Sequence, residues 1–448
     1  MGITYILIFI LFLHIYLFRK LIFKWNVFSV FFIATTIFSI SGILIFPFVK
    51  TLVIETFWTF RLHLITDTQI IKTQCIALIG LLLVLYSYSF VLMLIHGKIK
   101  CINLLKIDGP ITNNLSKSNY YFILFCISVF LLFYILIKRN TLITGIFDGL
   151  IGRSPDALLI SRRSITSNYL YVIITYNLLP FLTIISLYIS INSKSLLNKF
   201  IFYTLLFTSI ILILLLFQKR PLILFLMCLA IAGFIFKRHA IVKKIKKVRS
   251  KKATRRRFIL IGVALFSLLM LLYYSSTKYE FQNVFEAIKK LTEVSLTRIF
   301  GRLSIPAFFY VHYFPNVDAH YGISNIGTLS KIFGYDVFLD SRILFDYFSS
   351  NKKGGSLAIS SIMDFYGAFG YYGLVIGSVM LGAFLSILDT FLDKLEKNVV
   401  NIVFIIFCFV FAYYLSQASL ARSLLGYGFF FFVLTWVWLQ KGIKIKLR

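Results

Sequence analysis

Two cations stand at a short junction between apolar runs, within Gln218-Lys219-Arg220-Pro221. Charges at such a depth are costly unless they meet water, lipid headgroups or an anionic ligand. The planar guanidinium of Arg220 matches phosphate oxygens, and Lys219 adds a second positive charge beside it. The junction is therefore a candidate site for a phosphate or pyrophosphate group, with snorkelling of both side chains to the headgroups as the alternative.

Three more arginines are candidates for the same anion chemistry. Arg298 and Arg302 are four residues apart, so on a helix they would share one face and form a two-pronged clamp. Arg422 is the only charged residue in the short segment between the last two apolar runs. For each of them, contact with lipid headgroups is an equally open interpretation.

Three residues are candidates for proton transfer. Asp364 lies where an apolar run begins, and a carboxylate that enters a membrane is costly unless it has a function. The alternative is a carboxylate that interacts with the positive end of a helix. His312 and His320 lie in an aromatic stretch, where an imidazole suits proton transfer near neutral pH but is more often simply packed.

Several other kinds of chemistry are not indicated. The five cysteines are scattered, and no metal-ligand spacing occurs. The sequence contains no GxxxxGK[ST], HExxH or GxSxG pattern, and no cytoplasmic segment is long enough for a nucleotide-binding domain. We therefore expect no metal and no cofactor, and any reaction must use an activated substrate that is already in the membrane.

Apolar runs dominate the chain that must position these residues. Hydrophobic residues make up 59% of its 448 residues and charged residues only 14%, against about 45–50% and about 25% in soluble domains. A backbone in lipid must satisfy its own hydrogen bonds, so runs of this length form helices. The sequence predicts an all-α polytopic membrane protein, with one integral membrane domain over residues 1–448. About eleven transmembrane helices are expected, at residues 2–18, 27–48, 74–96, 120–137, 169–190, 200–217, 221–236, 258–274, 363–388, 399–416 and 424–440.

The distribution of charge sets the expected orientation. Residues 237–257 hold twelve basic residues and no acid, which predicts a cytoplasmic loop that contacts anionic membrane lipids and not nucleic acid. Of the sixteen acids, twelve then lie on the opposite side. The longest loop, residues 275–362, is also on that side, and apolar residues recur at helical spacing between Phe281 and Leu291. We expect an amphipathic helix there, lying in the interface.

Four features occur in order along residues 200–440. The first two are the Arg220 junction, followed by its basic loop, and the long late loop. The third is Thr297-Arg-Ile-Phe-Gly-Arg302, which precedes Tyr313-Phe-Pro315 and Tyr321-Gly-Ile-Ser324. The fourth is Asp364-Phe-Tyr-Gly-Ala-Phe-Gly370-Tyr-Tyr-Gly373, which opens the next span. In this order the features resemble those of Wzy-type O-antigen polymerases, the oligosaccharide repeat-unit polymerases of bacterial surface polysaccharides.

One spacing departs from that family. Some members carry an arginine, ten residues and a glycine, whereas Arg342 and Gly354 are one residue further apart. This departure bars a simple transfer of that motif to the present chain.

The resemblance implies a membrane glycosyltransferase on the periplasmic face of the bacterial inner membrane. A glycan carried on undecaprenyl pyrophosphate would be transferred to the terminal sugar of a second lipid-linked repeat unit. Arg220 would hold the leaving pyrophosphate, with Lys219, Arg298, Arg302 and Arg422 as further candidates, and Asp364 or His312 would act as base. The resemblance also implies a Wzz-type chain-length co-polymerase as a partner, and no metal.

Two alternatives remain open. An O-antigen ligase that transfers glycan to lipid A–core is similar in its number of spans and its late outer loop. A flippase or transporter for lipid-linked oligosaccharides is a different class, and would be expected to show internal symmetry and charges along a pathway at the membrane midplane. The expected spans have almost no charge in their interiors and no clear symmetry, which favours the enzyme.

Overall fold

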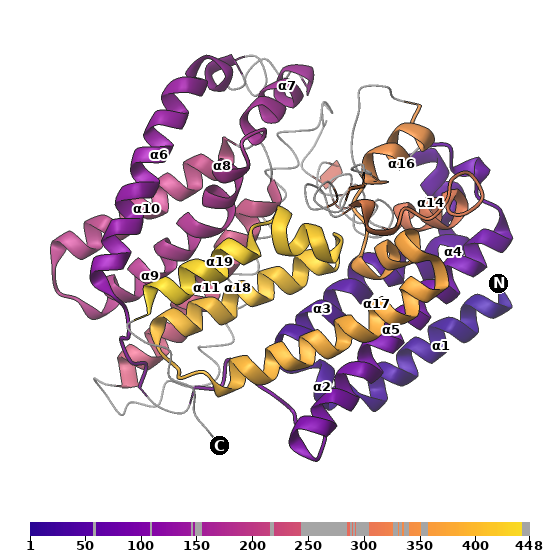
Figure 1. Ribbon diagram of the computed structural model, residues 1–448, viewed down its shortest axis with the longest axis horizontal. Coiled ribbons are helices and arrows are strands. Elements are labelled where there is room, and N and C mark those ends of the chain that lie inside the picture. The colour runs from indigo at the N-terminus through magenta and orange to yellow at the C-terminus, as the bar shows by residue number, and fades with distance from the viewer. Residues whose placement is uncertain are drawn as a thin grey trace. The chain divides into compact units, whose positions relative to one another are not determined.

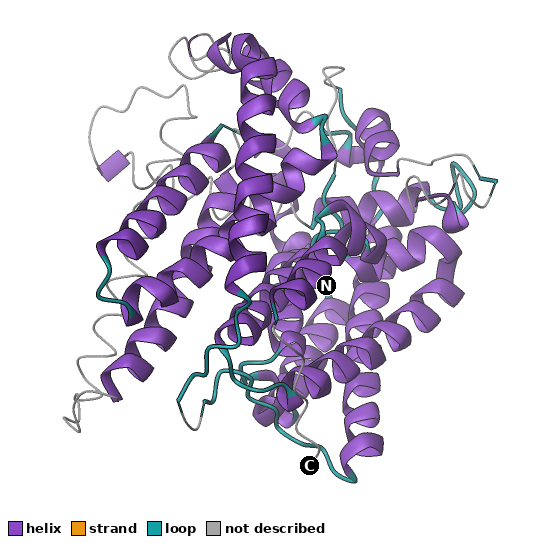
Figure 2. Ribbon diagram, turned by 60° about the vertical axis from the view of Figure 1, so that its left-hand side comes forward, coloured by secondary structure: helices purple, strands orange, loops and turns teal. Residues whose placement is uncertain are grey.

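The computed structural model describes residues 1–56, 60–107, 110–144, 147, 155–215, 219–242, 285, 286, 289, 292, 304–325, 330, 334, 335, 340–350 and 357–440. Helices account for the regular structure of these residues, which otherwise form only isolated bridges (Figure 2). Seven of the described helical segments are long and apolar enough to cross a membrane: Val27–Thr51, Asp67–His96, Lys117–Thr144, Tyr169–Asn192, Leu196–Leu214, Arg220–Arg238 and Ser361–Lys394. The chain therefore has the architecture of an all-helical polytopic membrane protein.

These seven helical segments coincide with seven of the eleven expected spans. Three others fall on shorter apolar helices, Gly2–Leu17, Val399–Leu415 and Phe429–Leu439. The expected span at 258–274 lies outside the described residues, as do residues 243–257 of the basic loop and most of the expected amphipathic helix. The helix found at the expected span 221–236 is longer than predicted, since it begins at Lys219 and continues to Val242.

The described residues divide into two compact units, of which the first comprises Met1–Lys106, Thr292–Lys394 and Cys408–Leu425. Its elements are α1 (Gly2–Leu17), α2 (Arg19–Ile22), α3 (Val27–Thr35), the π-helix η1 (Thr36–Ile40), α4 (Ser41–Thr56), η2 (Leu62–Leu64), α5 (Asp67–His96), α14 (Ile305–Tyr313), η6 (Gly322–Asn325), α16 (Asp340–Phe348), α17 (Ser361–Lys394) and η7 (Arg422–Gly426).

The second unit comprises Ile107–Leu291, Leu395–Phe407 and Gly426–Arg448. It contains α6 (Lys117–Thr144), α7 (Pro155–Thr166), α8 (Tyr169–Ile173), η4 (Ile174–Leu178), α9 (Leu179–Asn192), α10 (Leu196–Leu214), α11 (Lys219–Val242), the start of α18 (Val399–Leu415) and α19 (Phe429–Leu439). Aromatic packing joins α18 to α19, where the Phe404 and Trp436 rings stack at 4.3 Å. The Trp436 indole donates a hydrogen bond to Asn401 Oδ1 at 2.8 Å, which satisfies its polar atom inside the core.

Parallel packing of α5 and α17 forms the centre of the first unit (Figure 1). Glycines let the two helices approach closely: a Cβ at Gly80 would lie 2.9 Å from Leu374, and one at Gly382 would overlap the backbone of Val84. Ser87 Oγ donates to the carbonyl of Val379 at 2.7 Å. The N-terminal ends of the two helices consequently lie at one end of the unit and their C-terminal ends at the other.

The fully buried carboxylate of Asp389 ties this pair to α3. It accepts hydrogen bonds from the backbone N–H groups of Val27 at 2.7 Å and Phe28 at 3.1 Å, and from the Tyr88 hydroxyl at 2.9 Å. The first N–H groups of a helix have no partner within the helix, so Asp389 supplies one from α17. The carboxylate also complements the positive end of α3.

The segment expected as a long loop contains two short α-helices, besides η6, in its described part. The aromatic run becomes α14, in which Phe308 and Phe309 are fully buried. Residues 340–348, expected as loop, form α16, and Phe348 stacks on Phe309 with ring centroids 3.9 Å apart. Aromatic stacking stabilises helices that are too short to persist alone.

Replacement of Asp389 tests its role in tying α3 to α17. Asp389→Ala leaves three buried donors without an acceptor, and should lower the free energy of unfolding by about 2–4 kcal/mol. Asp393→Ala is the matched control, because it removes a partly exposed ion pair with Lys100 (2.7 Å), worth about 0–1 kcal/mol. Thermal unfolding in detergent measures both, and equal losses would contradict the assignment.

Candidate functional site

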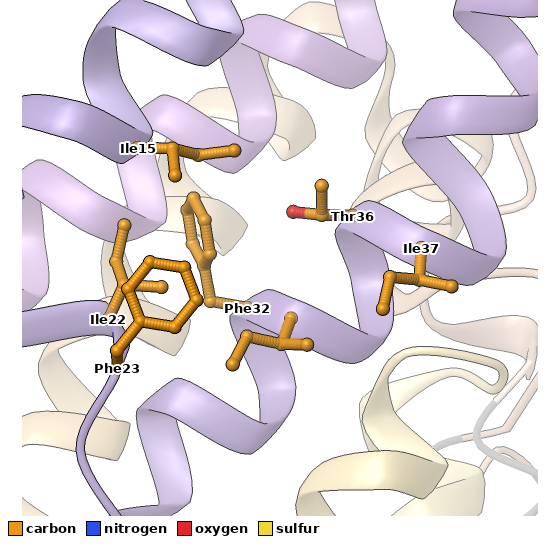
Figure 3. Close-up of a pocket in the computed structure, with 7 residues that line it drawn as sticks. Ile15, Ile22, Phe23, Phe32, Thr36 and Ile37 are labelled. Carbon is orange, nitrogen blue, oxygen red and sulfur yellow. The ribbon is translucent and has the colours of Figure 1, made fainter. Parts of the chain in front are cut away.

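A pocket in the first unit is apolar. Its lining comes from α1, α2, α3 and η1 and consists of isoleucine and phenylalanine side chains with one threonine, around a cavity of about 200 Å³ (Figure 3). Such a lining suits hydrocarbon and offers no cation or carboxylate to a polar substrate. The candidate chemistry lies elsewhere in the unit, at the N-terminal ends of α5 and α17.

Asp364 is the buried acid at this end. It lies in the first turn of α17 and is 8% exposed. The Tyr321 hydroxyl reaches its Oδ1 at 2.7 Å and its backbone oxygen at 2.9 Å. Since a hydroxyl carries one hydrogen, the two acceptors share it, and the contact fixes the orientation of the carboxylate.

A break in α17 brings Asp364 to this position. The backbone is non-helical at Phe369 (φ −135°, ψ 16°) and Gly370 (φ 64°, ψ −143°). Before the break the chain folds back, so that Phe365 packs on Gly373 and Gly377. In a straight helix, positions 365 and 377 would be about 18 Å apart. The two glycines, four residues apart, therefore form the groove that receives Phe365.

His320 lies against the break. Its Nδ1 is 3.0 Å from the carbonyl of Gly367, which can only accept, so Nδ1 carries the hydrogen. Any side chain at position 370 would place its Cβ only 2.9 Å from His320 Nε2, so the imidazole lies directly against the glycine. Tyr366 packs on the same imidazole, with the two ring centroids 5.6 Å apart and the rings edge to face. The Tyr366 hydroxyl donates a hydrogen bond to the carbonyl of Phe314 at 3.3 Å.

His312 is held by the start of α5. Thr66 and Gln69 form a capping box in which Gln69 Oε1 accepts from the Thr66 backbone at 3.0 Å. The same oxygen is 3.1 Å from His312 Nδ1, so Nδ1 donates and Nε2 is the basic nitrogen. Burial lowers the pKa of His312 below its ordinary value of 6.5, which keeps the ring neutral at pH 7.

Lys72 is the cation of the cluster. It lies one turn after Gln69 on α5, with its Nζ 6.0 Å from the Tyr366 ring centroid and 5.6 Å from that of Tyr371. These distances lie within the range of cation–π attraction. A carboxylate, two histidines, a lysine and several tyrosines therefore converge at one end of the α5–α17 pair.

The predicted site residues do not all belong to this cluster. Asp364 and His312 do, whereas Arg422 is an exposed residue of η7 in the same unit with no described contact to them. Arg220 belongs to the second unit, where its guanidinium lies 5.5 Å from the Tyr427 ring centroid. Arg298 and Arg302 lie outside the described residues, as does the side chain of Lys219.

Sequence reasoning missed Gln69, Lys72 and Tyr321 as members of the site. The pattern Thr66-x-x-Gln69 was a usable signal, since it marks the start of a helix. It would have moved the beginning of the expected span from 74 to 67 and placed Lys72 inside the helix. The segment Tyr321-Gly-Ile-Ser324 was noted for its resemblance, but nothing in it points to Asp364 as the partner of Tyr321, because the two are 43 residues apart.

Comparison with protein-family models, with curated proteins and with solved structures finds no match to this chain. The fold and the site therefore define a class only: a helical polytopic membrane protein with a polar cluster at the ends of two long helices.

Gly370→Ala tests the break in α17. Its backbone angles are rarely adopted by residues with a Cβ, and the methyl group would also press on His320. Gly97→Ala is the control, because Gly97 has φ 68° with open space around it and should lose only about 1 kcal/mol. We expect a larger fall in melting temperature for Gly370→Ala, and equal falls would contradict a specific role for the break.

The lowered pKa of His312 predicts a pH dependence of stability. Below pH 6.5 the unfolded chain binds a proton at this residue before the folded chain does, so stability falls as pH falls from 6.5 towards the lower folded pKa. His312→Gln should reduce the difference in melting temperature between pH 7.5 and pH 5, whereas replacement of the exposed His63 by Gln should not. An unchanged pH dependence in His312→Gln would contradict the inferred burial.

Proposed function

We propose that this chain is a membrane glycosyltransferase that polymerises undecaprenyl-pyrophosphate-linked oligosaccharide repeat units into O-antigen or a related surface polysaccharide. The observation that carries the proposal is the placement of Asp364. Its buried carboxylate accepts a hydrogen bond from Tyr321 at the N-terminal end of α17, the same end of the α5–α17 pair at which two histidines and Lys72 have their contacts. A buried carboxylate in such a cluster is costly to maintain, which favours a catalytic role.

The sequence supports the same proposal. Asp364 opens the segment of aromatic and glycine residues that resembles the polymerase family. In the structure each glycine of that segment has a positioning role: Gly367 packs on Tyr310, Gly370 makes the break, and Gly373 receives Phe365. The segment that carries the resemblance is thus the one that places the carboxylate.

The proposed reaction exchanges one bond at the anomeric carbon of the lipid-linked glycan. A sugar hydroxyl of the acceptor forms the new C–O bond, its proton passes to a base, and the bond to undecaprenyl pyrophosphate breaks with both electrons on the leaving oxygen. Asp364 is the first candidate for the base and neutral His312 the second. Positive side chains would stabilise the leaving pyrophosphate, and Arg220 remains a candidate with Arg298, Arg302, Lys219 and Arg422.

The finer topology belongs to this proposal. We place the chain in the bacterial inner membrane with about eleven spans, the N-terminal end of α17 and the loop 275–362 at the periplasmic face, and residues 237–257 in the cytoplasm. A Wzz-type co-polymerase would set the chain length. Two lipid-linked substrates held side by side in the membrane would bring donor and acceptor together.

Deletion and complementation test the function. A strain without this gene should make lipid A–core that carries one repeat unit only, and the wild-type gene should restore long polymer. Asp364→Asn at normal expression should reduce polymer by about a hundredfold or more, whereas replacement of the exposed Asp318 by Asn should leave polymer unchanged. Arg220→Ala tests the second unit in the same strain.

The outcomes separate the candidates. Long polymer that is made but not joined to lipid A–core in the deletion strain would assign the chain as a ligase instead. Accumulation of unpolymerised units on the cytoplasmic face would assign it as a flippase. Full restoration of polymer by Asp364→Asn would refute Asp364 as the base, and full restoration by Arg220→Ala would refute Arg220 as a pyrophosphate ligand.

A further inference from the structure

Lys72 lies near the N-terminal end of an exposed stripe of α5. One turn before it, Gln69 bonds to His312 in the polar cluster. Ile79 and Tyr86 follow Lys72 at intervals of seven residues, so they lie on the same face of the helix, and both are about half exposed. A lysine at this end of the stripe is within reach both of the cluster and of molecules in the surrounding lipid.

The charge of Lys72 is not paired with a described carboxylate. The ion pairs among the described residues are Lys50–Asp67 and Lys100–Asp393, both outside this cluster. The described contacts of the Lys72 ammonium are with the rings of Tyr366 and Tyr371, which attract a cation without neutralising it. An ammonium so placed keeps its attraction for an anion.

The break in α17 adds to this positive field. Tyr366 precedes Gly370 and Tyr371 follows it, so the two rings that hold Lys72 come from the two arms of the break. The second arm begins beside Lys72, and the start of a helix carries partial positive charge. Val375 and Ile376, one turn further along this arm, are about half exposed and apolar. Lys72 and the start of the second arm thus form a positively charged site at one end of the exposed apolar residues of α5 and α17. This arrangement matches a lipid with an anionic headgroup and an apolar tail.

We propose that Lys72, held between Tyr366 and Tyr371, binds the pyrophosphate group of an isoprenoid lipid whose tail lies along the exposed residues of α5 and α17. This assignment rests on the proposed function and deepens it, since it places a donor headgroup at the end of α17 that carries Asp364. Lys72 is then a substrate-binding residue of the first unit, independent of Arg220 in the second.

Snorkelling is the competing explanation for Lys72, and it predicts different behaviour. A snorkelling lysine lies in the headgroup region and interacts with any anionic lipid without preference. Lys50 offers the matched comparison, because it is a partly exposed lysine whose partner, Asp67, is the first residue of α5. The two lysines carry the same charge at the same end of the unit but differ in their surroundings.

The experiment is a binding titration of the purified full-length chain in detergent. Farnesyl pyrophosphate is the probe, with farnesol and inorganic pyrophosphate as separate arms. The wild type and Lys50→Gln should bind farnesyl pyrophosphate with affinities within about twofold, and Lys72→Gln should bind it roughly ten- to a hundredfold more weakly, as expected for loss of one charged hydrogen bond. Lys72→Arg, which keeps the charge, should retain part of the affinity. Equal affinity in Lys72→Gln and wild type would overturn the proposal.

A second measurement needs no substitution. Farnesyl pyrophosphate should protect Lys72 of the wild-type chain, and not Lys50, from acetylation by an amine-reactive reagent, as read by mass spectrometry. Unprotected Lys72 would overturn the proposal even if Lys72→Gln fails to fold. Equal protection by farnesol would show that the anion is not recognised and would overturn the proposal. Equal affinity for inorganic pyrophosphate would show that the isoprenoid tail does not contribute, and would overturn a lipid as the ligand.

Both assays are independent of polymer formation, so the two proposals can fail separately. Loss of binding in Lys72→Gln, together with normal polymer in the deletion strain, would retain the anion site and refute the polymerase. One-repeat glycan in the deletion strain, together with unchanged binding in Lys72→Gln, would retain the polymerase and refute the site.

Discussion

The parallel packing of α5 and α17 is the constraint on which the first unit depends. Glycines at 80 and 382 allow the two backbones to approach, and the contacts between the two helices at each end of the pair rely on that approach. At one end, Asp389 accepts hydrogen bonds from Tyr88 of α5 and from the start of α3. At the other end, the same parallel register brings Lys72 to the two tyrosines of α17. Structural and candidate functional groups are thus positioned by one helix pair.

A buried carboxylate lies at each end of the pair, and the two carboxylates differ in their hydrogen-bond partners. Asp389 has three described donors, two of them backbone N–H groups that would themselves lack a partner without it. Its role is explained by helix capping alone. The described contact of Asp364 is instead with the side-chain hydroxyl of Tyr321. The two acids lie on one helix, and helix capping accounts for Asp389 but not for this contact of Asp364.

Much of the fold could be predicted from the sequence, because long apolar runs leave few choices in lipid. Asp364 was also predictable, since a carboxylate at the start of a span is costly. The site as a whole was not, because its members meet over long separations: His312 and Gln69 are 243 residues apart. Lys72 was missed because the span was predicted to begin at residue 74, whereas the helix begins at Asp67. A lysine near the end of a span can lie inside the helix, because its long side chain reaches polar surroundings. Arg220, the first prediction from charge alone, belongs to the second unit.

The folded-back arm of α17 determines which part of this helix must span a membrane. Only residues 371–394 must cross as a continuous helix, and their length of about 36 Å is enough to span the hydrocarbon. The arm that carries Asp364 is short and is held by the contact of Phe365 with Gly373 and Gly377. The continuous part of α17 therefore has the length of a span without the arm, and the carboxylate of Asp364 lies outside the segment that must cross the hydrocarbon.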